Sequence, residues 1–240
     1  VVTPTFGDSQ SGVKTKQYAW TTSTTTPSSW TDYSSGTLTQ PGAGTHYLHY
    51  RIVDHAGNEK IGYVGPYRYD NTAPSANLTQ SPTSWTNGNV NLILTDVSDT
   101  LSGVKSITLP NGETITETSA TYTVTANGTY EFTITDVASN VTKKTITVSN
   151  IDKGNPSVTM DPNGNSSYAK SQSTKVTVSD SQSGIKTLQY AWSNSNSTAP
   201  TSWTNFTSGS TLTAPGSTGS YYLWVKASDQ AGNTVTTKSN

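Results

Sequence analysis

The chain has 240 residues, of which 12% are charged, with a net charge of −1 and no cysteine. This balance excludes binding to nucleic acid and to anionic membranes, because both need a concentrated basic face. The lack of cysteine excludes a disulfide-stabilised fold, and the many tyrosine and tryptophan residues exclude a disordered chain.

The sequence contains three copies of one repeated segment. A segment that opens with Asp-Ser-Gln-Ser-Gly and closes with Asp-x-Ala-Gly-Asn covers residues 8–58 and returns at residues 180–233. A shorter and diverged copy covers residues 99–140. A unit used several times in a row usually supplies length, spacing or multivalency, since an active site needs to be built only once.

Strict alternation of apolar and polar residues predicts antiparallel strands with one buried face each. In chain order, the clearest of these stretches begin at Val90, Tyr130, Thr145 and Lys175. No helical periodicity lasts for three turns. We expect about seven short strands in each repeat, which indicates a sandwich of two sheets.

Turn signals separate the predicted strands. Asn111-Gly112 and Asn127-Gly128 are each flanked by alternating segments. Asn-Gly in this setting predicts a β-hairpin, because both central residues of the favoured turn need a positive φ.

Proline-bearing linkers mark the domain boundaries. Asp70 to Pro74 and Asp152 to Pro156 occupy matching positions after the last strand of a repeat. Proline ends a strand ladder and stiffens the chain, so we expect modules at 1–70, 71–152 and 153–240 arranged as a rod. The N-terminal strand of the first module is expected to be missing or truncated, and the third module to be shortened at its C-terminal end.

A series of motifs runs through the middle of the chain, namely Ser81-Pro-Thr-Ser-Trp-Thr-Asn-Gly-Asn-Val90, Asp99…Ser-Gly-Val104, Tyr130…Asp136…Asn140 and Asp152…Pro156. In these motifs the chain resembles the bacterial Ig-like repeats of large Gram-positive surface and secreted proteins. It implies an all-β chain of tandem immunoglobulin-like β-sandwich modules and an extracellular location, either secreted or associated with the cell wall. The family includes spacers, adhesins and accessory modules of enzymes, so the fold does not fix the function.

Aspartates at the predicted turns are the candidates for binding a metal. Asp96, Asp99 and Asp136 are weak calcium candidates in the middle repeat, and the joints near Asp70 and Asp152 are a second place for this ion. Calcium needs six to eight oxygen ligands, and no run here approaches the density of an EF-hand. We therefore favour turn closure, in which the carboxylates accept backbone N–H groups, and expect no metal or other cofactor.

Two tryptophans are the candidates for binding a ligand. Trp30 and Trp203 follow loops rich in serine and threonine, from which an indole ring could stack on a sugar. Packing in the core is the interpretation that we prefer for both. His46, His49 and His55 would suggest a metal site, but the third repeat has no histidine at the matching positions.

The motifs of catalysis are absent. The chain has no cysteine nucleophile, no Gly-x-Ser-x-Gly elbow and no His-Glu-x-x-His pair. No apolar run is long enough to enter a membrane as a helix. We expect neither an enzyme, nor a nucleic-acid partner, nor membrane insertion.

We expect non-catalytic structural modules of a bacterial cell-surface or secreted protein, which space or present a neighbouring domain of the same chain. The alternative is an adhesin or carbohydrate-binding module that binds glycans or host surface proteins through the loops around Trp30 and Trp203. A further alternative is a set of accessory domains of a large extracellular polysaccharide-degrading enzyme. Self-assembly through an exposed strand edge of the first repeat is a separate prediction.

Overall fold

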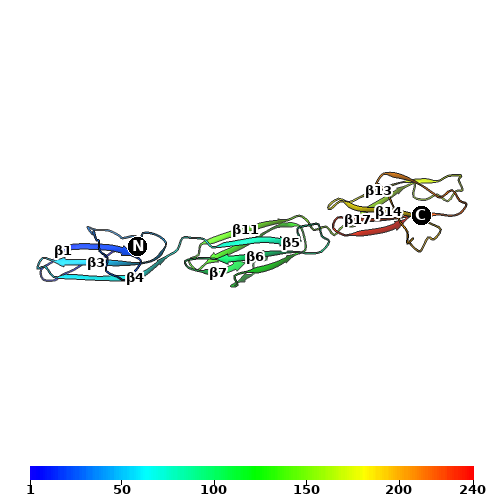
Figure 1. The fold of residues 1–240 in the computed structure, drawn as a ribbon. Coiled ribbons are helices and arrows are strands. Elements are labelled where there is room, and N and C mark those ends of the chain that lie inside the picture. Colours follow the sequence, from blue (N-terminus) through cyan, green and yellow to red (C-terminus); the bar gives the residue numbers. More distant parts are fainter. The chain divides into compact units, whose positions relative to one another are not determined.

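The computed structural model describes all of residues 1–240 and contains eighteen β-strands and no helix (Figure 1). A helix capable of crossing a membrane is accordingly not found. The strands pair in antiparallel sheets, so the prediction of an all-β chain is confirmed.

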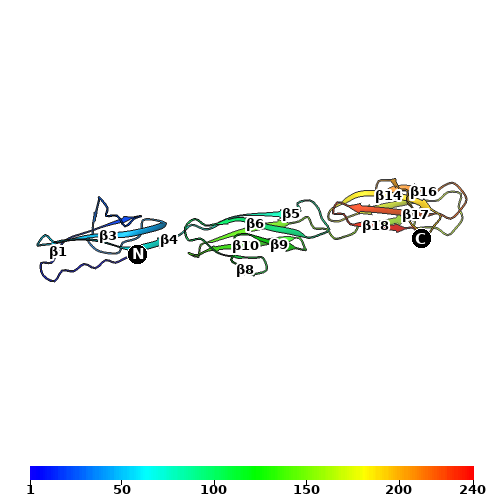
Figure 2. The same ribbon diagram turned by 60° about the horizontal axis from the view of Figure 1, so that its bottom comes forward.

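The first repeat contains one four-stranded sheet with the spatial order β2-β1-β3-β4. Its strands are β1 (Val13–Thr21), β2 (Thr31–Asp32), β3 (Gly44–Asp54) and β4 (Glu59–Tyr69). An isolated bridge joins Val2 to Leu38. The N-terminal segment, dark blue in Figure 2, runs alongside this sheet.

The second repeat has seven strands in two sheets, with the orders β11-β10-β7-β8 and β5-β6-β9. These strands are β5 (Ser75–Ser81), β6 (Val90–Ser98), β7 (Val104–Thr108), β8 (Thr114–Ile115), β9 (Ala120–Val124), β10 (Gly128–Asp136) and β11 (Val141–Val148). The expected alternation is clear in β6, where Val90, Leu92 and Leu94 are fully buried and Asn91 is exposed.

The third repeat also has seven strands in two sheets, with the orders β12-β13-β16 and β15-β14-β17-β18. These strands are β12 (Ser157–Asp161), β13 (Ser173–Ser179), β14 (Ile185–Ser193), β15 (Thr204–Asn205), β16 (Ser210–Thr213), β17 (Tyr222–Asp229) and β18 (Thr234–Lys238).

The two sheets of the third repeat share one hydrophobic core. Val176 and Val178 of β13 lie in the same buried cluster as Leu223 and Val225 of β17. Trp192 of β14 packs against this cluster, as expected for a tryptophan that anchors a sandwich core. Burial of the apolar faces of both sheets stabilises this repeat as a β-sandwich.

The two Asn-Gly pairs have different roles. Asn111-Gly112 lies in the turn between the paired strands β7 and β8, so the predicted hairpin is confirmed. Gly112 has a φ of 87°, but Asn111 does not have the positive φ that the favoured two-residue turn would need. Asn127-Gly128 connects β9 to β10, which belong to different sheets, so the predicted hairpin is wrong. The Asn127 side chain instead makes two hydrogen bonds to the backbone of Ile151, at 2.8 and 2.9 Å, and fixes the connection between the sheets.

Backbone contacts group the chain into two compact units. Unit 1 comprises Val1–Asn77, Thr95–Ser119 and Phe132–Lys144, and unit 2 comprises Leu78–Leu94, Ala120–Glu131 and Thr145–Asn240. The division passes through strands of the second repeat. The three modules with boundaries at residues 70 and 152, and their arrangement as a rod, stay predictions from the sequence.

Candidate functional site

In unit 1, the linker that follows β4 is bound to two turns of the second repeat. The Asp70 carboxylate accepts the backbone N–H of Ser102 at 3.0 Å, and its own carbonyl accepts the Asn140 side-chain amide at 3.2 Å. The other carboxylate oxygen of Asp70 accepts the N–H of Thr72 at 2.9 Å, which shapes the linker itself. Hydrogen bonds therefore hold both the side chain and the backbone carbonyl of Asp70.

In unit 2, the linker that precedes β12 is bound in the same way. The Asp152 carboxylate accepts the N–H of Ser183 at 3.0 Å, and its carbonyl accepts the Asn233 amide at 2.9 Å. Its second oxygen accepts the N–H of Gly154 at 2.8 Å. The repetition of all these contacts shows that they belong to the repeat and not to one local sequence.

The linker aspartates complete two groups of three carboxylates. Oxygens of Asp70, Asp99 and Asp136 all lie within 4.8 Å of one another. The second group consists of Asp152, Asp180 and Asp229, whose carboxylate oxygens also lie within 4.8 Å of one another. We call these groups the first and the second aspartate triad.

The first triad has one buried aspartate and the second has two, and the other members are half-buried. Asp136 and Asp229 are completely inaccessible to solvent, and Asp152 is 1% exposed. No lysine or arginine forms an ion pair with any of the six carboxylates. Negative charges this close together repel one another, and burial strengthens the repulsion because less water screens it.

The turn aspartates also bond to their own backbones. Asp99 Oδ1 accepts the N–H groups of Leu101, Ser102 and Gly103, and both oxygens of Asp136 accept donors of Asn140. These are the turn-closing bonds that the sequence predicts. They leave Asp99 Oδ2, which is buried and has no hydrogen-bond partner.

Hydrogen bonds keep the linker aspartates ionised. The Ser102 hydroxyl is the main group that holds the pKa of Asp70 below its ordinary value. For Asp152, burial raises the pKa, but hydrogen bonds from Ser183 and Gly154 outweigh it and the net pKa is lowered. A carboxylate that is anionic, close to two others and without a cationic side chain suits a divalent cation such as calcium.

The first repeat has only two members of such a triad. Asp8 accepts the Ser11 N–H and the Gly12 N–H at 2.9 and 2.7 Å, and Asp54 accepts the Asn58 amide at 2.7 Å. The Ser11 hydroxyl is the largest cause of a lowered pKa at Asp8, and the Asn58 amide is the largest cause at Asp54.

The structure brings together two of the three calcium candidates of the middle repeat. Asp99 and Asp136 meet in the first triad, whereas Asp96 is exposed and accepts bonds from Asn77 and Thr95. The sequence predicted a candidate calcium site at the linker near Asp70, but it did not predict that Asp99 and Asp136 meet Asp70 there. The available signal was the recurrence of an aspartate four residues before each linker proline.

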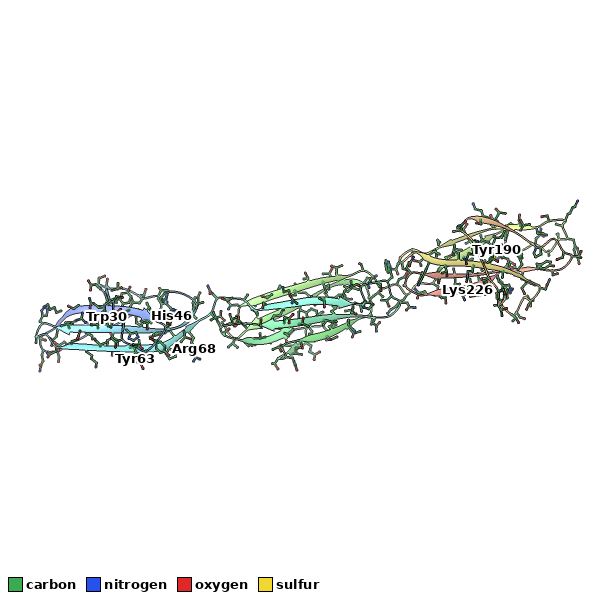
Figure 3. The ribbon with its side chains drawn as sticks, viewed as in Figure 1. Trp30, His46, Tyr63, Arg68, Tyr190 and Lys226 are labelled. Atoms are coloured by element: carbon green, nitrogen blue, oxygen red, sulfur yellow. The ribbon has the colours of Figure 1, made fainter.

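The candidate ligand-binding tryptophans lie at matching positions of the first and the third repeat. Trp30 lies directly before β2 and Trp203 directly before β15, and each is half-buried. Figure 3 labels Trp30 within the first repeat, and Tyr190 within the third. Trp30 lines neither of the two cavities of the first repeat, which have volumes of about 470 and 190 Å³.

The histidines of the first repeat have separate structural partners. His49 is 1% exposed, and its Nε2 is 3.0 Å from the carbonyl of Ser23. At the matching position, Trp224 donates its indole N–H to the carbonyl of Ser195 at 3.1 Å. His46 Nδ1 instead lies 2.8 Å from the side chain of Gln40, so these histidines do not converge on a metal.

Comparison with known proteins identifies no family. No family model and no curated protein matches the chain. One solved structure that it matches is the Bacteroides ovatus mixed-linkage glucan utilization locus protein SGBP-B, in complex with a mixed-linkage heptasaccharide. The match has 14% identity and covers 94% of this chain and 58% of that one, so the chain spans less than two thirds of that protein. Its TM-score of 0.20 is too low to support an argument about fold, ligand or location.

Proposed function

We propose that this chain consists of non-catalytic extracellular modules that space or present a neighbouring domain of a bacterial surface or secreted protein. The observation that carries the proposal is the aspartate triad at each linker. A spacer must transmit position from one repeat to the next, and a linker fixed to the following repeat at its carboxylate and its carbonyl does this. The low charge and the repeated architecture suit the same role.

Calcium is the cation that we assign to the two triads. Each triad offers carboxylates from a linker and from two turns of the following repeat, so an ion bound there would tie the linker to both turns. The ion would also offset the repulsion among the three carboxylates. The spacer would consequently be stiffer with calcium than without it.

Thermal unfolding with calcium or with EDTA tests this assignment. We expect calcium to raise the melting temperature of the native chain through binding to the folded state. The Asp99→Asn/Asp180→Asn double variant should lose this rise. In EDTA the same variant should be at least as stable as the native chain, because it removes one negative charge from each triad while an amide oxygen remains to accept the turn N–H groups.

Asp96→Asn is the matched control, because Asp96 lies in the same repeat but outside the triad. It should keep the full response to calcium. A calcium response that survives in the double variant would disprove the assignment, and a loss of stability of the double variant in EDTA would show that the carboxylates serve only the turns.

A glycan panel tests the spacer role against the adhesin alternative. The chain, displayed multivalently to allow for weak sites, should bind neither glycans nor host matrix proteins. Binding that disappears in the Trp30→Ala/Trp203→Ala variant without a change in melting temperature would replace the spacer proposal with a glycan-binding one.

A further inference from the structure

The first repeat has an open apolar groove on one face of its sheet. The groove has a volume of about 470 Å³ and is lined mainly by the N-terminal segment and the inner face of β3. The apolar residues that matter here are Val2, Phe6, Leu38, Leu48, Tyr50 and Ile52. A groove of this kind exposes apolar surface that the other repeats bury.

The third repeat shows what covers the equivalent surface. Strand β12 pairs antiparallel with β13, with Val158 opposite Val178 and Met160 opposite Val176. Both β12 side chains pack against the buried core cluster of this repeat. In the second repeat, β5 lies beside β6 and carries Ala76, which is 6% exposed, at the position of Val158.

The shared motif aligns the two repeats residue by residue. Because Asp8 matches Asp180, residues 1–7 match residues 173–179, which form β13. The bridge between Val2 and Leu38 accordingly corresponds to the pairing of Thr174 with Leu212. The N-terminal segment therefore takes the place of β13, and its outer edge corresponds to the edge on which β12 pairs.

This outer edge is free to pair with another strand. Successive N–H groups of an extended chain point to opposite edges, and Val2 directs its N–H and its carbonyl to Leu38. The N–H groups of Thr3, Thr5 and Gly7 have no backbone partner, and in an extended chain they would point to the edge opposite Leu38. Pro4, which has no N–H, falls on the edge that faces Leu38, so it does not weaken the open one.

The groups that hold a linker are also present in the first repeat. Ser11 and Asn58 match the serine and the asparagine that bind Asp70 and Asp152 in the other repeats. Beside them is a second cavity of about 190 Å³, which is lined by Asp8, Asp54 and Asn58. It shares Ile52 and Lys60 with the apolar groove, so the two spaces adjoin.

Lys60 adds a cationic donor where the two spaces meet. In the second repeat this position is Thr142, whose hydroxyl donates to the carbonyl of Pro74 in the linker. The Lys60 ammonium can donate to the carbonyl of the proline in a bound linker, and its positive charge complements the negative charge of the linker aspartate. The sequence motif of the linkers therefore fits both the groove and the cavity.

We propose that the first repeat binds an extended peptide strand of the linker type, supplied by the segment that leads out of another repeat of this kind. Such a strand carries an aspartate, then a proline four residues later, then apolar residues at alternate positions, as in residues 152–160. Its apolar side chains fill the groove, its backbone pairs with the open edge, and its aspartate joins Asp8 and Asp54. This proposal goes beyond the spacer function: binding of the strand needs no calcium, and only the expected effect of calcium on that binding rests on the calcium assignment proposed above.

The probe is a synthetic peptide with the sequence of residues 152–161, added to the full chain in EDTA and in calcium. We expect saturable binding by calorimetry in both conditions. The amide NMR signals that change position on addition of the peptide should be confined to residues 1–8, β3 and β4. Calcium should tighten binding, because the added aspartate completes a third triad. A peptide with Asp152→Asn should still bind in EDTA, and calcium should no longer tighten its binding.

A peptide with Val158→Asp and Met160→Asp is the matched control for the groove. It keeps the linker motif but cannot fill an apolar surface, so we expect affinity to fall about ten-fold or more. Equal binding of both peptides would overturn the proposal, as would shifts confined to the third repeat, where the peptide would be exchanging with β12. Absence of binding, with dimerisation of the chain in sedimentation analysis, would assign the open edge to a second copy instead. None of these outcomes affects the calcium test on Asp99 and Asp180.

Discussion

At the scale of single residues, different side chains meet the same structural requirement in different repeats. His49 and Trp224 occupy matching positions, both are buried, and each bonds to a carbonyl of the loop that follows the neighbouring strand of its sheet, β1 or β14. The requirement is an N–H donor on a ring large enough to fill the space. A histidine in this position is therefore a structural residue and not a remnant of a metal site.

This interpretation predicts the effect of removing the donor. His49→Ala should lower the free energy of unfolding of the first repeat by about 2–4 kcal/mol, because it leaves a cavity and an unpaired carbonyl at Ser23. His49→Gln should lose about 1 kcal/mol less, since its amide can still donate. Urea unfolding followed by the amide NMR signals of the first repeat measures both values, and equal losses would show that only ring packing matters.

The residues of the candidate site could be predicted only in part. Asp99 and Asp136 stand in recurring motifs, so the sequence identified them. Asp96 looks equally suitable in the sequence, but its φ of 54° and its bond to the Asn77 amide direct it elsewhere. The convergence of Asp70 with these turns depends on where the linker meets the following repeat, and no local spacing encodes that distance.

At the scale of strands and turns, local patterns predict pairing well where the partners are close in sequence. Alternation located β6, β10, β11 and β13, and Asn111-Gly112 located a hairpin, because each depends on backbone preferences within a few residues. Asn127-Gly128 has the same local pattern but connects strands of two sheets. The Asn127 side chain bonds to the backbone of Ile151, which is 24 residues away in the sequence. A prediction from neighbouring residues alone cannot include such a distant partner.

The strand that closes a sandwich is a second case in which the sequence was informative only after comparison between repeats. Strands β5 and β12 are short, and their alternation alone would predict weak edge strands. Their shared position after an aspartate and a proline shows that the linker and the closing strand are one continuous element. Fixing the aspartate therefore also fixes the register of the strand that follows it.

At the scale of the whole molecule, four aspartates with lowered pKa values link stability to pH. The carboxyl groups of Asp8, Asp54, Asp70 and Asp152 are all more acidic in the folded chain than in the unfolded one. The folded chain consequently binds fewer protons than the unfolded chain in the acid range. Their stabilising contribution is complete above the unfolded pKa, near pH 4, and is lost as the pH falls through the lower folded values.

We therefore expect the melting temperature in EDTA to be nearly constant between about pH 7 and 5 and to fall progressively below about pH 4. Asp8→Asn/Asp54→Asn should flatten this fall for the first repeat alone, because the amides keep hydrogen bonds but do not titrate in this range. In calcium the fall should begin at a higher pH, since protons compete with the ion for the same oxygens. A melting temperature that rises on acidification would mean that repulsion within the triads outweighs the hydrogen bonds that hold these carboxylates ionised, and it would reverse the sign of the linkage.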